Sequence, residues 1–185
     1  IKVYYVKDET QTKELSYMVK YYKDGIEVEA DRIIVKKKVW INDADELAID
    51  EFDSSEDRYK GYSFVEIKPY QLGDTILNRG VIEVYYEINV YEYTINYYKD
   101  EINEDNLLET INGEANYNTL IEIDEIKYLP KGYEYKGEDV DFVIDVEKNI
   151  VNIVYTKGIF EYTVEYYYDG IINDEFTETL TAEYN

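Results

Sequence analysis

An eight-residue segment, Tyr-Xaa-Val/Ile-Xaa-Tyr-Tyr-Xaa-Asp, occurs three times in this chain of 185 residues. The copies begin at Tyr17, Tyr93 and Tyr162, so they lie 76 and 69 residues apart. Self-similarity at a nearly fixed period is the signature of a tandem array, in which each repeat is one supersecondary unit. The chain is therefore expected to fold as a row of small, similar units rather than as one large domain.

Two further patterns keep the same register as these copies. A strand-like segment that ends in tyrosine precedes each copy, at residues 1–5, 82–86 and 151–155. A Gly-Tyr pair falls in the middle of each of the first two repeats. We expect the second tyrosine of each copy to occupy an equivalent central-strand position, and each glycine to occupy a turn before a strand that starts with its tyrosine. These repeat anchors are Tyr21, Tyr97, Tyr166, Gly61, Gly132, Tyr62 and Tyr133.

The order of these patterns predicts the domain boundaries. Residues 1–15 would hold the closing strand of a preceding repeat and a linker, residues 16–90 the first unit, and residues 91–158 the second. Residues 159–185 would be the truncated start of a third unit, so the sequence is expected to be part of a longer protein. The joins between units are short and lack Gly-Ser or Pro runs, which restricts rotation and favours an extended rod.

Composition excludes several classes of function. The 42 acidic residues outnumber the 19 basic ones and give a net charge of −23, which repels nucleic acid and anionic lipid surfaces. No apolar run approaches the roughly 20 residues that span a bilayer, so membrane insertion is not expected. Cysteine and histidine are absent, which removes thiol nucleophiles, imidazole bases, disulfides and the usual zinc and copper ligands.

The remaining candidate chemistry rests on carboxylates and serines. Acidic residues crowd one short region, where a solvated acidic face is the simplest interpretation; they are Asp43, Asp45, Asp50, Glu51 and Asp53. Calcium is the alternative for such a cluster, but the spacing of an EF-hand loop is missing here and at residues 138–141. The serines have no histidine to activate them. No catalytic, cofactor-binding or metal-binding residue is predicted, and the chain is not expected to be an enzyme.

Local patterns predict strands with few helices. Alternating apolar residues indicate strands around both joins, and Asp-Gly at residues 24–25 and 169–170 indicates tight hairpins. Glu101 replaces that glycine in the second unit, so its turn should be longer or of another type. Cap-like residues predict a short helix or helical turn over residues 42–52 and another over residues 118–128. The expected fold class is α+β and strand-dominated.

Tyrosine is the main aromatic residue, with 24 tyrosines against five phenylalanines and one tryptophan. A tyrosine suits a half-buried sheet position, where the ring faces the core and the hydroxyl reaches water. The alternative is that exposed rings form platforms for sugars or peptides. The two interpretations differ in where exposed aromatic residues lie. Clustering on one patch in each unit would favour binding, and scattering would favour a structural role.

These residues resemble the MucBP-type (mucin-binding protein) repeats of Gram-positive cell-surface proteins. The carrying features are the opening Tyr-Thr-Ile/Val-Xaa-Tyr-Tyr-Xaa-Asp, the mid-repeat Gly-Tyr, the closing Val-Asn-Ile-Val-Tyr, and a Glu-Thr followed by a small residue. The last of these reads Glu109, Thr110 and Gly113 in the second unit and Glu178, Thr179 and Ala182 in the third. The first unit departs from the pattern over residues 27–57, where Ile-Ile-Val-Lys-Lys-Lys-Val-Trp replaces the Glu-Thr segment.

The resemblance implies tandem small β-grasp (ubiquitin-like) units of a bacterial adhesin. Such a protein would be extracellular and anchored to the cell wall through regions outside this sequence. Two functions follow from it. The array would act as a stiff stalk that presents distal adhesive domains, which we favour, or it would bind host mucin glycan or a surface protein directly through exposed tyrosines.

The ends of the chain raise a separate expectation. In a β-grasp unit the first and closing strands lie side by side, but residues 1–6 form a closing strand without its unit and residues 162–184 an opening hairpin without its closing strand. The N-terminal strand would then either fold back on residues 17–22 or add to the hairpin of another copy. The second arrangement predicts head-to-tail self-association.

Overall fold

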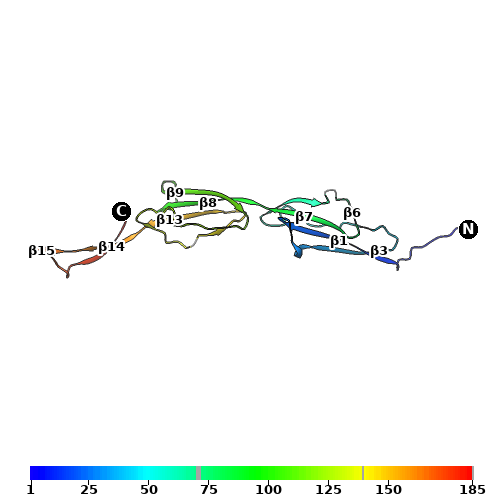
Figure 1. Cartoon of the computed structure of the whole chain (residues 1–185), viewed down its shortest axis with the longest axis horizontal. Coiled ribbons are helices and arrows are strands. Elements are labelled where there is room, and N and C mark those ends of the chain that lie inside the picture. The colour runs from blue at the N-terminus through cyan, green and yellow to red at the C-terminus, as the bar shows by residue number, and fades with distance from the viewer. Residues whose placement is uncertain (70–71, 139, 185) are drawn as a thin grey trace. The chain divides into compact units, whose positions relative to one another are not determined.

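The computed structural model describes residues 1–69, 72–138 and 140–184, which divide into two compact units, Ile1–Asn89 and Val90–Asn185. Strands dominate both units (Figure 1). In the described ranges the helices are two short 3-10 segments, η1 (Glu29–Asp31) and η2 (Glu104–Asn106). The strand-dominated prediction is thus confirmed, and helix is almost absent.

The first unit is built on one mixed sheet. Its strands are β1 (Thr12–Lys23), β2 (Ile26–Glu27), β3 (Ile33–Trp40), β5 (Tyr62–Lys68) and β7 (Gly80–Ile88). The long strand β1 lies antiparallel to β3 along one edge and parallel to β7 along the other. Strand β5 then pairs antiparallel with β7. A separate small ladder joins β4 (Glu46–Ala48) to β6 (Thr75–Leu77).

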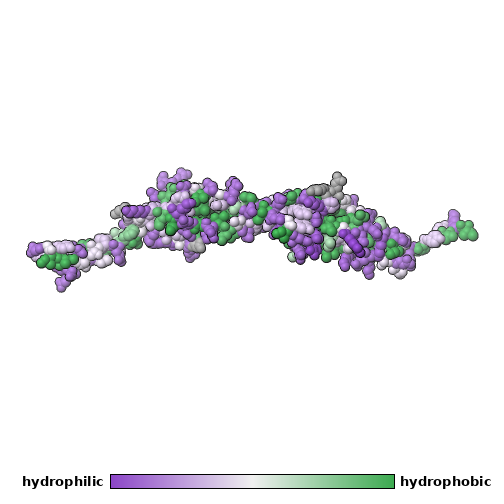
Figure 2. Space-filling model, viewed as in Figure 1, coloured by the Kyte–Doolittle hydropathy of each residue, from purple (hydrophilic) through white to green (hydrophobic). Residues whose placement is uncertain are grey.

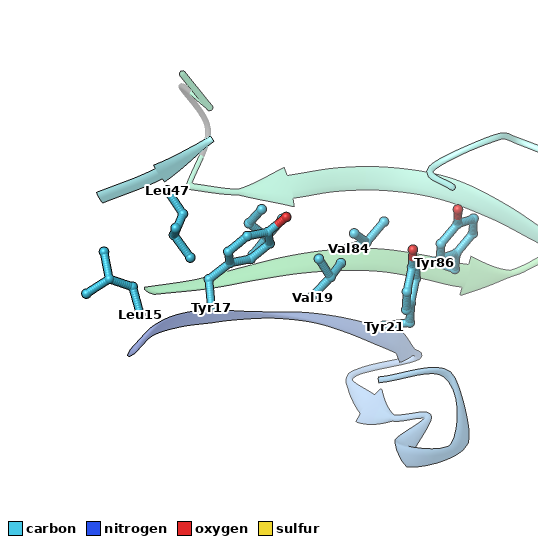
Figure 3. Close-up of a cluster of buried hydrophobic side chains, with 8 residues drawn as sticks. Leu15, Tyr17, Val19, Tyr21, Leu47, Val84 and Tyr86 are labelled. Atoms are coloured by element: carbon cyan, nitrogen blue, oxygen red, sulfur yellow. The ribbon is translucent and has the colours of Figure 1, made fainter. Parts of the chain in front are cut away.

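The core of this unit lies on one face of the sheet. Alternate residues of β1 point to that face because side chains in a strand alternate with a period of two. Leu15, Tyr17, Val19 and Tyr21 are each at most 2% exposed, and the residues between them are only half-buried. Figure 3 shows these side chains beside Val84 and Tyr86 of β7, with Leu47 of β4 facing them. The buried cluster is completed by Leu47, Ile82, Val84 and Tyr86.

The second unit repeats the same strand arrangement. Its sheet runs β9 (Leu107–Asn116), β8 (Val90–Lys99), β13 (Ile150–Lys157) and β11 (Tyr133–Glu134), and β8 and β13 are the parallel pair. Strands β10 (Leu120–Ile121) and β12 (Phe142–Val143) form a small ladder of their own. The buried cluster is Ile95, Tyr97, Ile123, Ile153 and Tyr155.

The turns agree with the sequence. Asp24 and Gly25 adopt φ of 48° and 77°, and Lys23 pairs with Ile26, so this hairpin has a two-residue turn. The same backbone recurs at residues 169–170, where β15 (Tyr167–Tyr168) meets β16 (Ile171–Ile172). In the second unit the pairing jumps from Tyr98 to Leu107, so its turn is longer, as predicted. Asn103 caps η2 within that loop by accepting from the Asn106 amide.

The two predicted helices are wrong. In residues 42–52 the chain forms β4 instead, where buried Leu47 lies between exposed neighbours, which is the period of a strand. Near the expected start of that helix, the Asp43 carboxylate accepts a hydrogen bond from the Trp40 amide and so closes a turn. In residues 118–128 the chain forms β10 and a series of turns. Asn118 has φ of 64°, a left-handed conformation that cannot begin an α-helix.

The predicted N-terminal strand is not formed within the chain. Residues 1–8 carry no secondary structure and are exposed. The fold-back on residues 17–22 is wrong because both edges of β1 are already occupied, one by β2 and β3 and the other by β7. At the other end, β14 (Ile159–Val164) pairs antiparallel with β17 (Glu178–Glu183). The unit division keeps these last residues with the second unit.

Candidate interaction surfaces

The three anchor tyrosines do not share one environment. Tyr21 and Tyr97 lie in β1 and β8, are 0% and 1% exposed, and face Val84 and Ile153 of the parallel strand. Tyr166 lies between strands and is 48% exposed. The expectation of three equivalent strand positions is therefore wrong for Tyr166. Tyr166 differs from the other two because β14 pairs only with β17 in the described part of the chain, so no parallel strand covers this position.

The anchor glycines lie in turns at matching places. Gly61 and Gly132 adopt φ of 78° and 83°, which an L side chain adopts only with strain. Each carbonyl accepts a hydrogen bond from the residue after the closing strand, at 2.9 Å from the Asn89 amide and 2.8 Å from the Gly158 amide. Tyr62 and Tyr133 then start β5 and β11, and both rings pack on the buried clusters.

Buried tyrosine hydroxyls hold the irregular segments over the core. Each of four core tyrosines makes a hydrogen bond to the backbone of a segment that crosses the buried face. The pairs are Tyr17 with the Asp50 amide (2.8 Å), Tyr86 with the Ser55 carbonyl (3.0 Å), Tyr97 with the Asp124 carbonyl (3.1 Å) and Tyr155 with the Glu125 carbonyl (2.7 Å). Burial raises the pKa of Tyr86 and of Tyr97 to about 12. These tyrosines are structural, and their hydroxyls are not offered to a ligand.

The first unit adds a cationic contact to its core. The Arg58 guanidinium carbon lies 3.9 Å from the centre of the Tyr21 ring, and its Nη1 lies 2.9 Å from an Asp53 oxygen. Hydrogen bonds from the Ser55 hydroxyl and amide, with Arg58 in support, lower the pKa of Asp53. The Tyr59 hydroxyl donates to Asp31, whose carboxylate also lies near Arg58. This set closes one end of the core, and no sequence motif predicted it.

Among the crowded acids, Asp43, Asp45, Asp50 and Asp53 are paired with cations rather than gathered around a site. The Lys13 ammonium lies 2.6 Å from an Asp45 oxygen and the Lys37 ammonium lies 2.5 Å from an Asp50 oxygen. Asp53 pairs with the Arg58 guanidinium. Within residues 1–69, 72–138 and 140–184, no group of three or more acids is arranged to hold a metal ion. These carboxylates therefore form a solvated, ion-paired surface.

One aromatic pair lies on the outer face of the first sheet. The rings of Tyr22 and Tyr85 stack with centroids 4.7 Å apart and planes 13° apart. Both hydroxyls donate to Glu83, at 3.1 and 3.0 Å, and Lys68 lies 4.6 Å from the Tyr85 ring centre. The matching register of the second unit pairs Tyr98 with Val154, so the stack is not repeated there.

Exposed aromatic side chains gather in the terminal segments. Between residues 12 and 157, every described aromatic residue is buried or half-buried. The exposed ones are Tyr4, Tyr5, Phe160, Tyr162, Tyr166, Tyr167, Tyr168 and Phe176. Exposed isoleucine and valine residues lie in the same segments, and Figure 2 shows hydrophobic surface on the segment that carries the N label in Figure 1 and on the segment that carries β15.

Two hollows accompany these features. The first, of about 590 Å³, lies over β8 and β9 where the Tyr93 ring crosses Gly113; a β-carbon on that glycine would come within 2.5 Å of the ring. This close approach explains the small residue of the Glu-Thr motif. The second, of about 410 Å³, is lined by residues 166–168 with Asn173, Phe176 and Glu178.

Among the described residues, no helix has the length and apolar character needed to cross a membrane.

No protein-family model and no curated protein matches this chain, but solved structures do. The crystal structure of Mub-RV is 10% identical in sequence to this chain, with a TM-score of 0.28. The match covers 77% of this chain and 98% of the Mub-RV chain. The type 2 repeat of the mucus binding protein MUB from Lactobacillus reuteri is 9% identical, with a TM-score of 0.24. The match covers 77% of this chain and 99% of that repeat. The Bacillus anthracis TIE protein is 12% identical with a TM-score of 0.35, and this chain spans 44% of it.

Mub repeats are thus among the solved structures to which this chain is similar.

Proposed function

We propose that this chain is a non-enzymatic spacer, a stiff repeat region of a bacterial cell-surface adhesin that presents adhesive domains lying elsewhere in the protein. The observation that carries the proposal is the placement of the aromatic residues. Between residues 12 and 157 every described ring is buried or half-buried, and most tyrosines pack on the two cores instead of forming an exposed patch in each unit. This is the outcome expected of a structural module.

The repeated architecture supports a tandem rod. Both units carry the same sheet order with a central parallel pair, as the β-grasp arrangement implied by the resemblance requires. Irregular segments held by tyrosine hydroxyls take the place of its helix. In this proposal the units are residues 16–90 and 91–158, and residues 159–185 begin a third. Strand β8 starts at Val90, directly after Asn89, so the join has no length for free rotation.

The charge of the chain suits an extracellular stalk. A net charge of −23 makes neighbouring copies repel one another when they stand side by side on a surface. It also disfavours nucleic acid and anionic membranes as partners. Anchoring to a cell wall would come from regions outside this sequence.

Direct binding of mucin glycan or a host surface protein is the second candidate function. The stacked Tyr22 and Tyr85 rings favour it, because an aromatic face with adjacent carboxylate and ammonium groups can hold a sugar ring. Both rings are only half-buried. The pair occurs in one unit, which is why we rank this function second.

The rod is tested by the tumbling of the two units. Nuclear spin relaxation of the full chain should give both units one common, anisotropic correlation time. A variant with a flexible Gly-Ser insertion after Asn89 is the matched control, and its units should tumble independently. If the native chain already behaves like the insertion variant, the stiff spacer is wrong.

The second candidate is tested with a glycan array and immobilised mucin. We expect no binding by the native chain. Binding that is lost in Tyr85→Ala, and kept in the corresponding Val154→Ala variant of the second unit, would replace the spacer by the binding function.

A further inference from the structure

We propose that the free edge of β3 in the first unit binds an extended acidic segment of a partner protein as an added antiparallel strand. We call this edge, which residues 34–38 form, the β3 edge. The partner strand carries an acid, any residue, a second acid, any residue and an apolar residue, in that order. The inference concerns a partner of the first unit and does not depend on the spacer role.

The β3 edge is the side of β3 that faces away from β1. Strand β3 pairs only with β1 in the described part of the chain, and in Figure 1 it runs along the outside of the first unit. Two contacts at its end give the phase of its hydrogen bonds. The Ile41 amide donates to the Gln11 carbonyl at 2.9 Å, whereas the Trp40 amide turns the other way and bonds the Asp43 carboxylate. Odd-numbered residues of β3 therefore bond β1, and even-numbered ones point their N–H and C=O groups outward.

Three residues of this edge offer unpaired backbone groups. They are Ile34, Lys36 and Lys38, whose N–H and C=O groups have no hydrogen-bond partner within residues 1–69, 72–138 and 140–184. Such a row is a template for an extended peptide, which gains main-chain hydrogen bonds by adding to it. An antiparallel strand would pair one of its own residues with each of the three.

The corresponding edge is also free in the second unit, which has chain on both sides. Its strand is β9, since Tyr93 pairs with Gly113 as Tyr17 pairs with Val35. Among the described residues β9 pairs only with β8. The free edge therefore belongs to the architecture of the unit.

Charge distinguishes the two edges. Lys36 and Lys38 of the first correspond to Glu114 and Asn116 of the second. The Lys36 side chain is 62% exposed, and its ammonium lies 3.7 Å from a Glu14 oxygen. Lys38 is exposed and forms no ion pair with any described residue. In a chain with 42 acidic and 19 basic residues, this edge is thus a local basic site, and it is complementary to carboxylates.

The side chains of the edge determine the sequence of the partner. Val35 and Val39 pack on the core, so the residues between them on β3, Lys36 and Lys38, lie on the outer face with Ile34. Residues directly opposite each other in an antiparallel pair share a face. The partner therefore places its two acids opposite the lysines and its apolar residue opposite Ile34.

An apolar row supports this register. Ile34 is 57% exposed and pairs with Met18 of β1, which in turn pairs with Val81 of β7. An apolar side chain opposite Ile34 would extend this row by one strand. Its burial favours binding, because apolar area is removed from water.

Edge lysines also protect a sheet from unwanted pairing. An ammonium loses part of its hydration when a strand arrives, and only a carboxylate directly opposite compensates for that loss. The two lysines therefore exclude neutral and basic strands and admit an acidic one. The net charge of −23 opposes every acidic partner, but at physiological ionic strength charges interact over about 8 Å, so the adjacent lysines dominate for a short strand.

The first test is a titration of the isotope-labelled full chain with the capped peptide Thr-Glu-Thr-Glu-Thr-Ile-Thr, followed by nuclear magnetic resonance at physiological ionic strength. The amides of Ile34, Lys36 and Lys38 should become protected from hydrogen exchange, because their N–H groups gain acceptors. The amides of β9 should not change, which makes the second unit an internal control.

Backbone methylation separates strand addition from simple attraction of charges. N-methylation of the second glutamate removes an N–H that faces β3 and should weaken binding about tenfold or more. N-methylation of the threonine before it alters an N–H that points away from β3, and it should weaken binding only a few-fold.

Charge reversal tests the two lysines. Lys36→Glu and Lys38→Glu should each weaken binding of the peptide about tenfold, since each places like charges opposite each other. The double variant should instead bind a peptide in which lysines replace both glutamates. Lys136→Glu is the control, because it changes the net charge equally on the second unit and should leave the affinity within about twofold.

Three results would overturn the proposal. One is the absence of any change at the β3 edge up to millimolar peptide. Another is equal binding of the two methylated peptides, which would show that the lysines attract any polyanion. The third is protection of the same amides that grows with protein concentration in the absence of peptide, which would show that the edge pairs with a second copy of this chain.

Discussion

Tyrosine in this chain combines an apolar ring with a hydroxyl that holds the backbone. Tyr97 is 1% exposed, yet its hydroxyl reaches the Asp124 carbonyl at 3.1 Å. A phenylalanine would fill the same space but remove this hydrogen bond, and the carbonyl would keep only the Lys127 amide at 3.3 Å. The abundance of tyrosine thus follows from covering a small sheet with segments that have no regular structure.

The raised pKa values of buried tyrosines predict alkaline unfolding. Tyr86 and Tyr97 keep their protons up to a pKa of about 12, whereas a tyrosine in the unfolded chain ionises near pH ~10. Between these values the unfolded state loses a proton that the folded state keeps, so stability is full below pH ~10 and falls as the pH rises toward about 12. Thermal midpoints recorded by circular dichroism across this range should decline. Tyr97→Phe should make the decline of the second unit shallower, and an unchanged slope would contradict this account.

A second residue-scale prediction concerns Gly132. Its φ of 83° lies where a side chain is strained, and a β-carbon there would come within 2.2 Å of the Tyr184 ring. Gly132→Ala should therefore destabilise the second unit by about 1–3 kcal/mol. Lys136→Ala is the control, because it removes only a surface ion pair with Glu134 and should cost no more than about 1 kcal/mol. Chemical denaturation of both variants measures the difference, and equal losses would exclude a special backbone role for Gly132.

At the scale of elements, alternation predicted the long strands and failed for the segments between them. The period of two along β1 and β8 is strong because one whole face is buried, and Asp-Gly marks its hairpins without ambiguity. Residues 42–52 and 118–128 carry cap-like polar residues that suit a turn as well as a helix. What decides between the two is tertiary: a single buried leucine, and tyrosine hydroxyls that come from strands far away in the sequence. Local patterns contain no information on either.

Tyr166 also shows that a tertiary contact, rather than the local sequence, decides the structure of a segment. Its sequence context matches Tyr21 and Tyr97, but its position depends on a parallel neighbour that those two have and that β14 lacks within the described part of the chain. The Arg58 contact over Tyr21 was missed for a related reason, since it joins residues 37 positions apart with no motif to connect them.

The β4 and β6 ladder gives a matched test at this scale. Leu47 of β4 is 4% exposed and belongs to the core, while Leu77, on the partner strand of the same ladder, is 71% exposed. Leu47→Ala should destabilise the first unit by about 2–5 kcal/mol through the lost transfer energy and the cavity. Leu77→Ala should stay within about 0.5 kcal/mol. Unfolding curves of the two variants decide the matter, and similar losses would mean that residues 42–52 do not pack as described.

At the scale of the whole molecule, charge opposes association between copies. The net charge of −23 drives copies apart. At physiological ionic strength charges interact over about 8 Å, so the repulsion acts between copies that come close and reaches farther when the salt concentration is low.

The chain should therefore stay monomeric at low salt, because copies that each carry a charge of −23 repel one another over a long range. Any association should strengthen as salt is raised, since screening removes this repulsion. Sedimentation velocity of the native chain at a series of salt concentrations measures the trend. Association that weakens as salt is raised would show instead that attraction between oppositely charged groups outweighs the repulsion of the whole chain.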